Sequence, residues 1–304
     1  EELAAIGLDQ CVRVSHDAPS LAGIGRFLRE EKRMVRNPLP LLAALALVGC
    51  ASEAPAGGQA ATGETPAAME PATATAQPVA QGAVTGARDE NVSTPDYAFS
   101  YSYPAQAGSI PGVRALLDAD LARRKATTAE FAEQGRREAR ENGFPFSQHD
   151  FGMGWDVVAD LPGWLSLSAG FSTYTGGAHP NSGFDALLWD KRAERVRTPL
   201  ELFRSERAFA DAVRADFCKA LDKERAERRD GVAAGIFDDC VEPTEAVIIM
   251  GSSNRKTFDR IGFLIAPYIA GPYAEGSYEV TLPVGKALLD RVRPEFRDSF
   301  APGK

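Results

Sequence analysis

The stretch that most constrains this chain is the apolar run LPLLAALALVGC, from Leu39 to Cys50. It holds no charged residue, and Arg36 stands just before it. A helix needs about 20 apolar residues to cross a bilayer, so this run is too short to be a transmembrane span. A buried core helix that ends at Gly49 is the alternative, but a polar tail without aromatic residues follows the run at once.

Residues 34–50 resemble the signal of a bacterial lipoprotein. Met34 to Asn37 supply a start residue and a short basic segment, and the apolar run ends in Leu-Val-Gly-Cys. In such signals the cysteine becomes the lipidated first residue of the mature protein. The resemblance therefore implies a signal peptide at 34–49 and a lipid anchor on Cys50 that holds the protein to a membrane. Because Ala51, not Asp, follows the cysteine, it also favours the periplasmic face of the outer membrane.

The segments on either side of this signal differ in composition from a folded domain. Residues 1–33 do not fit the signal and are interpreted as an upstream extension. A small cytoplasmic segment before a membrane anchor is the alternative, which the shortness of the apolar run disfavours. Residues 51–90 contain no Leu, Ile or aromatic residue. They are predicted to form, after Cys50, a disordered tether with a reach of about 35 Å.

Charge and cysteine content narrow the function classes. The chain has 304 residues and a formal net charge of −8, which argues against binding nucleic acid. Of four cysteines, Cys218 and Cys240 remain beyond the signal and are predicted to pair as a disulfide in an oxidising compartment. Only His149 and His179 remain after processing, without ligand spacing, so neither a metal site nor a cofactor is expected.

Hydrophobic periodicity predicts the elements of the remaining chain. Tyr97 to Tyr103 alternate aromatic and small residues, so order is expected to start near Tyr97 with a strand. Ser109 is predicted to cap a helix that ends at Asn142-Gly143, with a break near 126–128 left open. Further strands are predicted at 153–160, 164–174, 184–190, 247–250, 258–265 and 278–282, and helices at 205–229 and 284–292. This order favours an α+β fold with antiparallel sheets and a few packed helices. The basic run 224–229 is interpreted as a solvated helix face.

Three stretches together resemble one group of extracytoplasmic proteins. They are YTGGAHPN at 174–181, TPLELF at 198–203, and the segment from Ile265 through GPYAEG to EVTLP at 279–283. Their order is similar to the extracytoplasmic domain of RsiV-like proteins, which often follows a small domain first described in the deacetylase PdaC. The resemblance implies a PdaC-type α+β domain at 91–145 and an RsiV-like α+β domain at 146–304.

The resemblance also implies limits on function. RsiV is an anti-sigma factor that senses lysozyme, but this chain has a lipoprotein signal where RsiV has a transmembrane helix. It lacks a clear sigma-binding segment, unless residues 1–33 are one. The catalytic chemistry of PdaC resides in a separate metal-dependent domain. Here Asp238-Asp239 is not followed by a histidine pair, so deacetylase activity is not carried over and no catalytic residue is assigned.

The sharpest polar cluster lies around His179. Gly176 and Gly177 permit a tight turn that could display His179 next to Asn181, with Tyr174 just before the turn. Tyr268 and Tyr273 stand among Gly and Pro and could form an aromatic contact surface. These seven residues are the predicted binding site. The alternatives are that His179 only holds its turn through a backbone hydrogen bond and that the tyrosines only cover the core.

Three functions are compatible with these observations. The first is a lipid-anchored envelope protein with a non-catalytic module that binds a protein, such as a lysozyme-like one, or peptidoglycan. The second is a cell-wall hydrolase with His179 at its centre. The third is an anti-sigma-type envelope sensor. A hydrolase needs a pocket in which a histidine and an acid lie within hydrogen-bond reach, whereas a binding module does not.

Overall fold

A computed structural model of the chain describes residues 86–229 and 235–304. The upstream extension 1–33, the signal peptide 34–49, Cys50 and the tether up to residue 85 lie outside the described residues. Within the described ranges, no helix combines the length and apolar character needed to cross a membrane.

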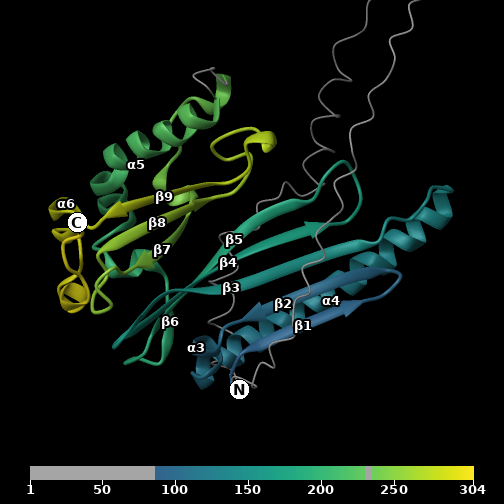
Figure 1. Cartoon of the computed structure of the whole chain (residues 1–304), viewed down its shortest axis with the longest axis horizontal. Helices are drawn as coiled ribbons and strands as arrows, with labels where there is room; N and C mark the ends of the chain where they lie inside the picture. Colours follow the sequence, from purple (N-terminus) through teal and green to yellow (C-terminus); the bar gives the residue numbers. More distant parts are fainter. Residues whose placement is uncertain (1–85, 230–234) are drawn as a thin grey trace, which may run out of the picture. The chain divides into compact units, whose positions relative to one another are not determined.

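The first layer is a six-stranded sheet whose strands follow chain order. Its strands are β1 (Arg88–Ser93), β2 (Tyr97–Tyr103), β3 (His149–Leu161), β4 (Trp164–Tyr174), β5 (Asn181–Asp190) and β6 (Arg195–Arg197). Neighbours run antiparallel, except that β2 and β3 are parallel. Two helices connect this parallel pair, the short α3 (Ala105–Gly108) and the long α4 (Pro111–Asn142), which lies along one face of the sheet (Figure 1). The predicted α+β class is confirmed, with one parallel pair that was not expected.

The aromatic alternation of β2 builds the core beneath this sheet. Phe99, Tyr101 and Tyr103 are buried and pack with Val113 and Leu117 of α4. Tyr101 accepts a hydrogen bond from the Trp155 indole at 2.8 Å. The period of two therefore identified both the strand and the face that packs against α4.

Helix α4 differs from its prediction at two points. Ser109 is not its cap, because Ile110 stands at the N-cap and the Ser109 hydroxyl donates to the Gln106 carbonyl at 2.9 Å. The helix is also continuous through 126–128, where the Thr128 hydroxyl donates back to the Arg124 carbonyl at 2.9 Å. That bond gives the Thr128 hydroxyl a hydrogen-bond acceptor within the helix. The helix ends as predicted, with Gly143 in the left-handed region at φ 71°.

Strand β1 corrects the expectation that disorder continues to residue 90 and that order starts near Tyr97. Its backbone pairs with β2 from Arg88 opposite Tyr103 to Ser93 opposite Ala98. Backbone pairing does not require apolar side chains on an edge strand, so a polar sequence gave no period to detect. The sheet also continues across the division expected after residue 145, because Tyr97 to Ser102 pair with His149 to Gly154.

The second layer is an antiparallel three-stranded sheet. It contains β7 (Val247–Gly251), β8 (Arg260–Ile265) and β9 (Tyr278–Pro283), with α5 (Glu206–Arg229) along one face (Figure 1). As predicted, the Ser205 hydroxyl accepts from the Ala208 amide at 3.1 Å at the start of α5. The buried apolar residues of α5 and of β8, such as Phe217 and Phe263, belong to one core. Leu161, Trp164 and Leu188 of the larger sheet belong to the same core.

The connections between these elements are short. A 3₁₀ turn, η2 (Pro199–Leu202), leads to α5, and others follow at Gly235–Phe237, Pro243–Glu245, Tyr273–Glu275 and Pro294–Ser299. The closing helix α6 (Lys286–Leu289) is shorter than the predicted 284–292. Its chain leaves the helix because Val292 forms a bridge with Phe203.

Candidate functional site

The structure brings three of the predicted binding residues into contact across 94 residues of sequence. His179 lies in the loop between β4 and β5, and Tyr268 and Tyr273 lie in the loop between β8 and β9. The His179 and Tyr273 rings stack with centroids 3.7 Å apart and an interplanar angle of 19°. The Tyr268 ring lies 6.3 Å from His179 and 5.6 Å from Tyr273. We call these three residues the His179 cluster.

The β4–β5 loop holds His179 through its own backbone. Gly176 and Gly177 have φ of 96° and 103°, a region that residues with a Cβ rarely adopt. Tyr174 closes this turn by donating to the Gly177 carbonyl at 3.1 Å. Asn181, the first residue of β5, pairs with Thr173 and is exposed, and among the described residues its side chain forms no hydrogen bond to the cluster. The predicted turn is therefore present, and Asn181 is its boundary residue.

His179 forms hydrogen bonds through both ring nitrogens. Its Nδ1 lies 2.9 Å from the Pro180 carbonyl, which can only accept, so Nδ1 donates to it. Its Nε2 lies 3.2 Å from the Tyr268 hydroxyl, within hydrogen-bond distance. Tyr273 donates to the same Pro180 carbonyl at 2.9 Å. Thus His179 holds its turn through a backbone carbonyl and also joins the two loops.

The hydrogen-bond partners of His179 are both uncharged groups. In the described residues, His179 hydrogen-bonds to the Tyr268 hydroxyl and the Pro180 carbonyl, and to no carboxylate. A general base of the hydrolase type needs an acid that orients the imidazole. The described ranges also contain no group of three potential metal ligands. By contrast, Tyr268 is 54% exposed and presents a ring to solvent.

Tyr268 is held in an unusual backbone conformation, with φ of 70°. Replacing it by glycine should therefore leave a protein about 1 kcal/mol more stable than the alanine variant at this position, since only glycine adopts this φ without penalty. Urea denaturation of both variants measures the difference in the free energy of unfolding. Equal stability of the two variants would contradict a left-handed backbone at Tyr268.

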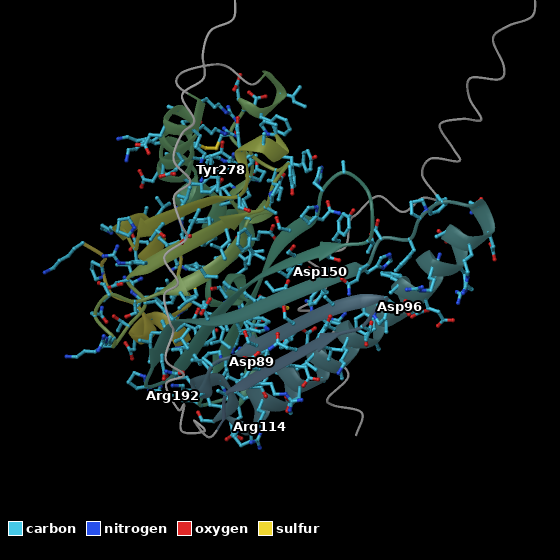
Figure 2. The ribbon with its side chains drawn as sticks, turned by 45° about the vertical axis from the view of Figure 1, so that its right-hand side comes forward. Asp89, Asp96, Arg114, Asp150, Arg192 and Tyr278 are labelled. Carbon is cyan, nitrogen blue, oxygen red and sulfur yellow. A yellow bond between two sulfur atoms is a disulfide. The ribbon has the colours of Figure 1, made fainter. Side chains whose placement is uncertain are left out.

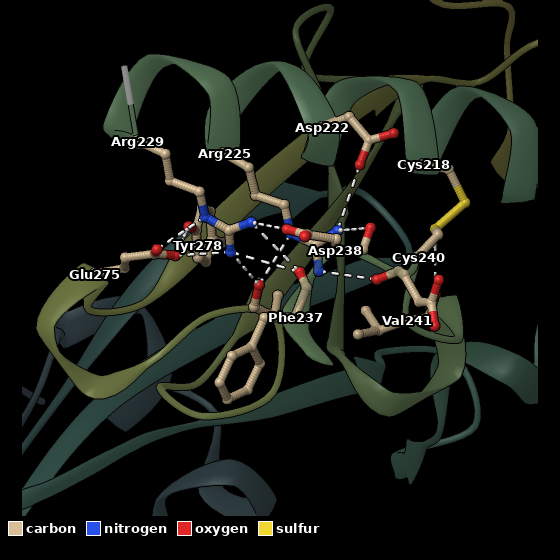
Figure 3. A network of polar contacts seen from close by, with 12 residues as sticks. Cys218, Asp222, Arg225, Arg229, Phe237, Asp238, Cys240, Val241, Glu275 and Tyr278 are labelled. Atoms are coloured by element: carbon tan, nitrogen blue, oxygen red, sulfur yellow. Dashed lines mark hydrogen bonds and ion pairs between the residues drawn. A yellow bond between two sulfur atoms is a disulfide. The ribbon is translucent and has the colours of Figure 1, made fainter. Parts of the chain in front are cut away.

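Two arginines of α5 position the loop that carries both tyrosines (Figure 3). Arg229 donates through Nε and Nη2 to the two oxygens of Glu275, at 2.8 and 2.9 Å. Its Nη1 donates to Asp238 at 2.8 Å. Arg225 is only 3% exposed and donates to the Ala270 carbonyl at 2.9 Å and to the Asp239 carbonyl at 3.0 Å. These bonds connect α5 to residues 270–275 and to residues 238–239.

The prediction that 224–229 is a solvated face is thus wrong for Arg225 and Arg229. Both guanidinium groups lie under loops that follow α5, and the side chain of Arg229 is only 8% exposed. Arg228 stacks over Tyr278, 4.0 Å from its ring centroid, and donates to the Ser277 carbonyl. Tyr278 is itself buried in the three-stranded sheet (Figure 2).

The disulfide prediction is confirmed. Cys218 of α5 is bonded to Cys240, 22 residues later, with Cα atoms 5.5 Å apart (Figure 3). Cys240 directly follows the carbonyls that Arg225 holds. The disulfide and the arginines therefore bind the same segment to α5.

The Arg229–Glu275 pair predicts a pH dependence of stability. The hydrogen bond from Arg229 holds the pKa of Glu275 below its ordinary value of 4.5, although burial acts to raise it. The stabilisation should be complete above pH 4.5 and should be lost as the pH falls through the lower pKa of the folded state. Glu275→Gln should flatten this part of the profile in urea titrations, whereas Glu227→Gln, at an exposed ion pair, should not. A profile that Glu275→Gln leaves unchanged would contradict the assignment.

A second feature was missed by the sequence interpretation. A cavity of about 260 Å³ lies between α4 and strands β3 to β5, and none of the seven predicted binding residues lines it. Its lining on α4 mixes large and small residues, among them Leu117 and Thr128, and this mixture gave no periodic signal in the sequence.

Part of this chain is similar to known proteins. Residues 90–182, from β1 into β5, match the family model described as deacetylase PdaC. No curated protein matches the chain significantly. A similar solved structure is a DUF3298 family protein from Pseudomonas aeruginosa PAO1, at 14% identity over 72% of this chain and 95% of that chain, with a TM-score of 0.49. Another is a DUF3298 family member from Bacteroides fragilis NCTC 9343, at 15% identity over 70% and 93%, with a TM-score of 0.48. The similarity to the PdaC family model thus covers the range 91–145 predicted to be PdaC-type and continues to residue 182.

Proposed function

We propose that this protein is a lipid-anchored envelope protein whose folded part binds cell-wall glycan without catalysis. The observation that carries the proposal is the His179 cluster, in which a stacked His–Tyr pair and an exposed tyrosine from two distant loops form one aromatic surface. Aromatic side chains suit binding because they bring a large contact area at a low cost in conformational entropy.

A groove beside the cluster supports glycan as the ligand. It crosses strands β1 to β5 and is lined mainly by serine, glycine and the polar Asp89 and Asn91. Ser100, Gly152 and Ser172 are cross-strand neighbours, so the groove has no bulky side chains along this row. Ser182 and Ser277 bring its lining to the two segments that carry the cluster. Hydroxyl groups that meet aromatic rings match the polar edges and apolar faces of sugar rings.

Binding of the purified full chain to peptidoglycan sacculi tests the ligand. His179→Ala, Tyr268→Ala and Tyr273→Ala should each reduce the bound fraction at least about fivefold, which is the effect of losing about 1 kcal/mol of contact. Phe144→Ala is a matched control, because Phe144 is similarly exposed at 52% but lies after α4. Retention equal to that of the control would contradict the proposal. Binding to lysozyme but not to sacculi would favour a protein ligand instead, as in a sensor.

The same variants decide between binding and hydrolysis. Sacculi incubated with the protein should release no soluble fragments. Chromatography of the supernatant measures this release. Fragment release that disappears in His179→Ala, while circular dichroism shows an intact fold, would replace the binding proposal with an enzyme.

Membrane anchoring is a separate part of the proposal and rests on the residues around Cys50. Cys50→Ser should release the protein from the membrane fraction or leave it unprocessed, as seen by intact mass. Cys11→Ser is the control, because Cys11 lies upstream of the expected cleavage site and should change neither property. Unchanged mass and membrane retention in Cys50→Ser would reject a lipid anchor at this residue.

A further inference from the structure

A cavity of about 260 Å³ lies between α4 and strands β3 to β5. The buried residues Leu117 and Thr128 line it from the helix, and Arg124 and Phe131 of the same helix complete that side. Interiors are otherwise close-packed, so a space of this size needs an explanation.

Aromatic side chains form the walls of this cavity. Phe151 of β3 and Phe171 of β4 lie side by side, with centroids 6.5 Å apart and an interplanar angle of 15°. Trp155 adds to the same wall, and Phe131 lines the cavity from α4. Phe131 is 51% exposed, although it is a large apolar residue on a helix that packs against a sheet.

The two arginines at the cavity are paired with acids. Arg124 binds Asp120 of its own helix at 2.8 Å and also bonds to Asp185 of β5. Its guanidinium carbon lies 5.5 Å from the ring centroids of both Phe151 and Phe171. Arg123 also pairs with Asp120. Asp150, the remaining acid of the lining, is exposed.

His149 is the most buried titratable residue of the lining, at 5% exposure. Burial lowers its pKa below the ordinary value of 6.5, so it is uncharged at neutral pH. An anionic ligand in this cavity would therefore lose its hydration without meeting a free cation, which is unfavourable.

We propose that this cavity binds a small, planar aromatic molecule of about ten non-hydrogen atoms that carries no negative charge. The size follows from comparison with an engineered apolar cavity of about 150 Å³, which holds benzene. The flat aromatic wall favours a planar ring system over a branched alkyl group, and the paired arginines disfavour an anion. The site is separate from the His179 cluster and does not depend on the function proposed for it.

Ligand-observed NMR with the full chain tests this site, with indole as the probe. Indole should bind with a dissociation constant of about 1 mM or tighter. Indole-3-acetate, which adds a negative charge, should bind at least about tenfold more weakly because both arginines of the lining are already paired with acids. Equal affinity of indole-3-acetate, or no binding of indole, would overturn the proposal.

A pair of adjacent substitutions locates the site. Thr127→Trp should fill the cavity and reduce indole binding at least about tenfold, whereas Ala126→Trp places the same ring at an exposed position outside the lining. Thr173→Trp fills the cavity from β4. It replaces Thr127→Trp in this test if circular dichroism shows that Thr127→Trp does not fold. Indole binding that persists in a folded cavity-filling variant would place the ligand elsewhere and reject the site.

Discussion

Replacing Arg225 by alanine should lower the free energy of unfolding by about 2 to 4 kcal/mol. The guanidinium group is buried and donates to the backbone carbonyls of Ala270 and Asp239 (Figure 3). Alanine would leave the Asp239 carbonyl without this donor, and the Ala270 carbonyl would keep only the longer bond from Arg229 Nη2 at 3.2 Å. Each unsatisfied buried group costs about 1 to 3 kcal/mol. Equilibrium urea denaturation followed by circular dichroism measures the change.

Arg207→Ala provides the matched control for this prediction. It makes the same substitution on the same helix, but the Arg207 side chain is 91% exposed and its pair with Asp211 is 3.7 Å long. An exposed pair of this kind contributes at most about 1 kcal/mol. Arg225→Lys should be intermediate, since it keeps the charge but lacks the planar fork that reaches two segments. A loss in Arg225→Ala no larger than in Arg207→Ala would show that the network does not stabilise the fold.

Removing the Cys218–Cys240 disulfide should cost about 3 kcal/mol, because it closes a loop between positions 22 residues apart in the chain-entropy model. The double variant Cys218→Ala/Cys240→Ala should therefore unfold at a lower urea concentration than the parent. Reductant should lower the stability of the parent by a similar amount and leave the double variant unchanged. Alkylation of the native protein followed by mass measurement checks the bond itself, and two modified thiols at these positions would refute it.

The losses of unfolding free energy caused by Arg225→Ala and by removal of the disulfide should not be additive. Arg225 holds the carbonyls of Asp238 and Asp239, and Cys240 is the next residue. Once the disulfide is absent, the segment can move away from α5, so part of what Arg225 contributes is already lost. The triple variant should lose less than the sum of the two effects, as is usual for residues that share partners.

Local periodicity predicted the parts of this fold in which one residue type repeats. The aromatic alternation of Tyr97 to Tyr103 identified β2, and the periodicity that predicted a helix at 205–229 identified α5. The glycines before His179 identified a turn. These features depend on neighbours within a few residues, which the sequence displays directly.

Features that depend on distant partners were not predictable in the same way. Arg225 and Arg229 have the composition of an exposed helix face, and only the loops that fold over them make them buried. His179 and Tyr273 were both candidates, but nothing in either motif indicated that their rings would stack. The cavity beneath α4 arises from the spacing between a helix and a sheet, which is a property of packing and not of either segment alone.

The parallel pairing of β2 with β3 has a consequence for any shortened form of this protein. A chain that began at residue 146 would lose β1, β2 and α4 together, and β3 would become an outer strand of up to 13 residues. Its freed amide and carbonyl groups, and the aromatic face that α4 now covers, would be open to strands of other molecules. Such a fragment should aggregate during purification, so the folded region is best produced from residue 86 onward.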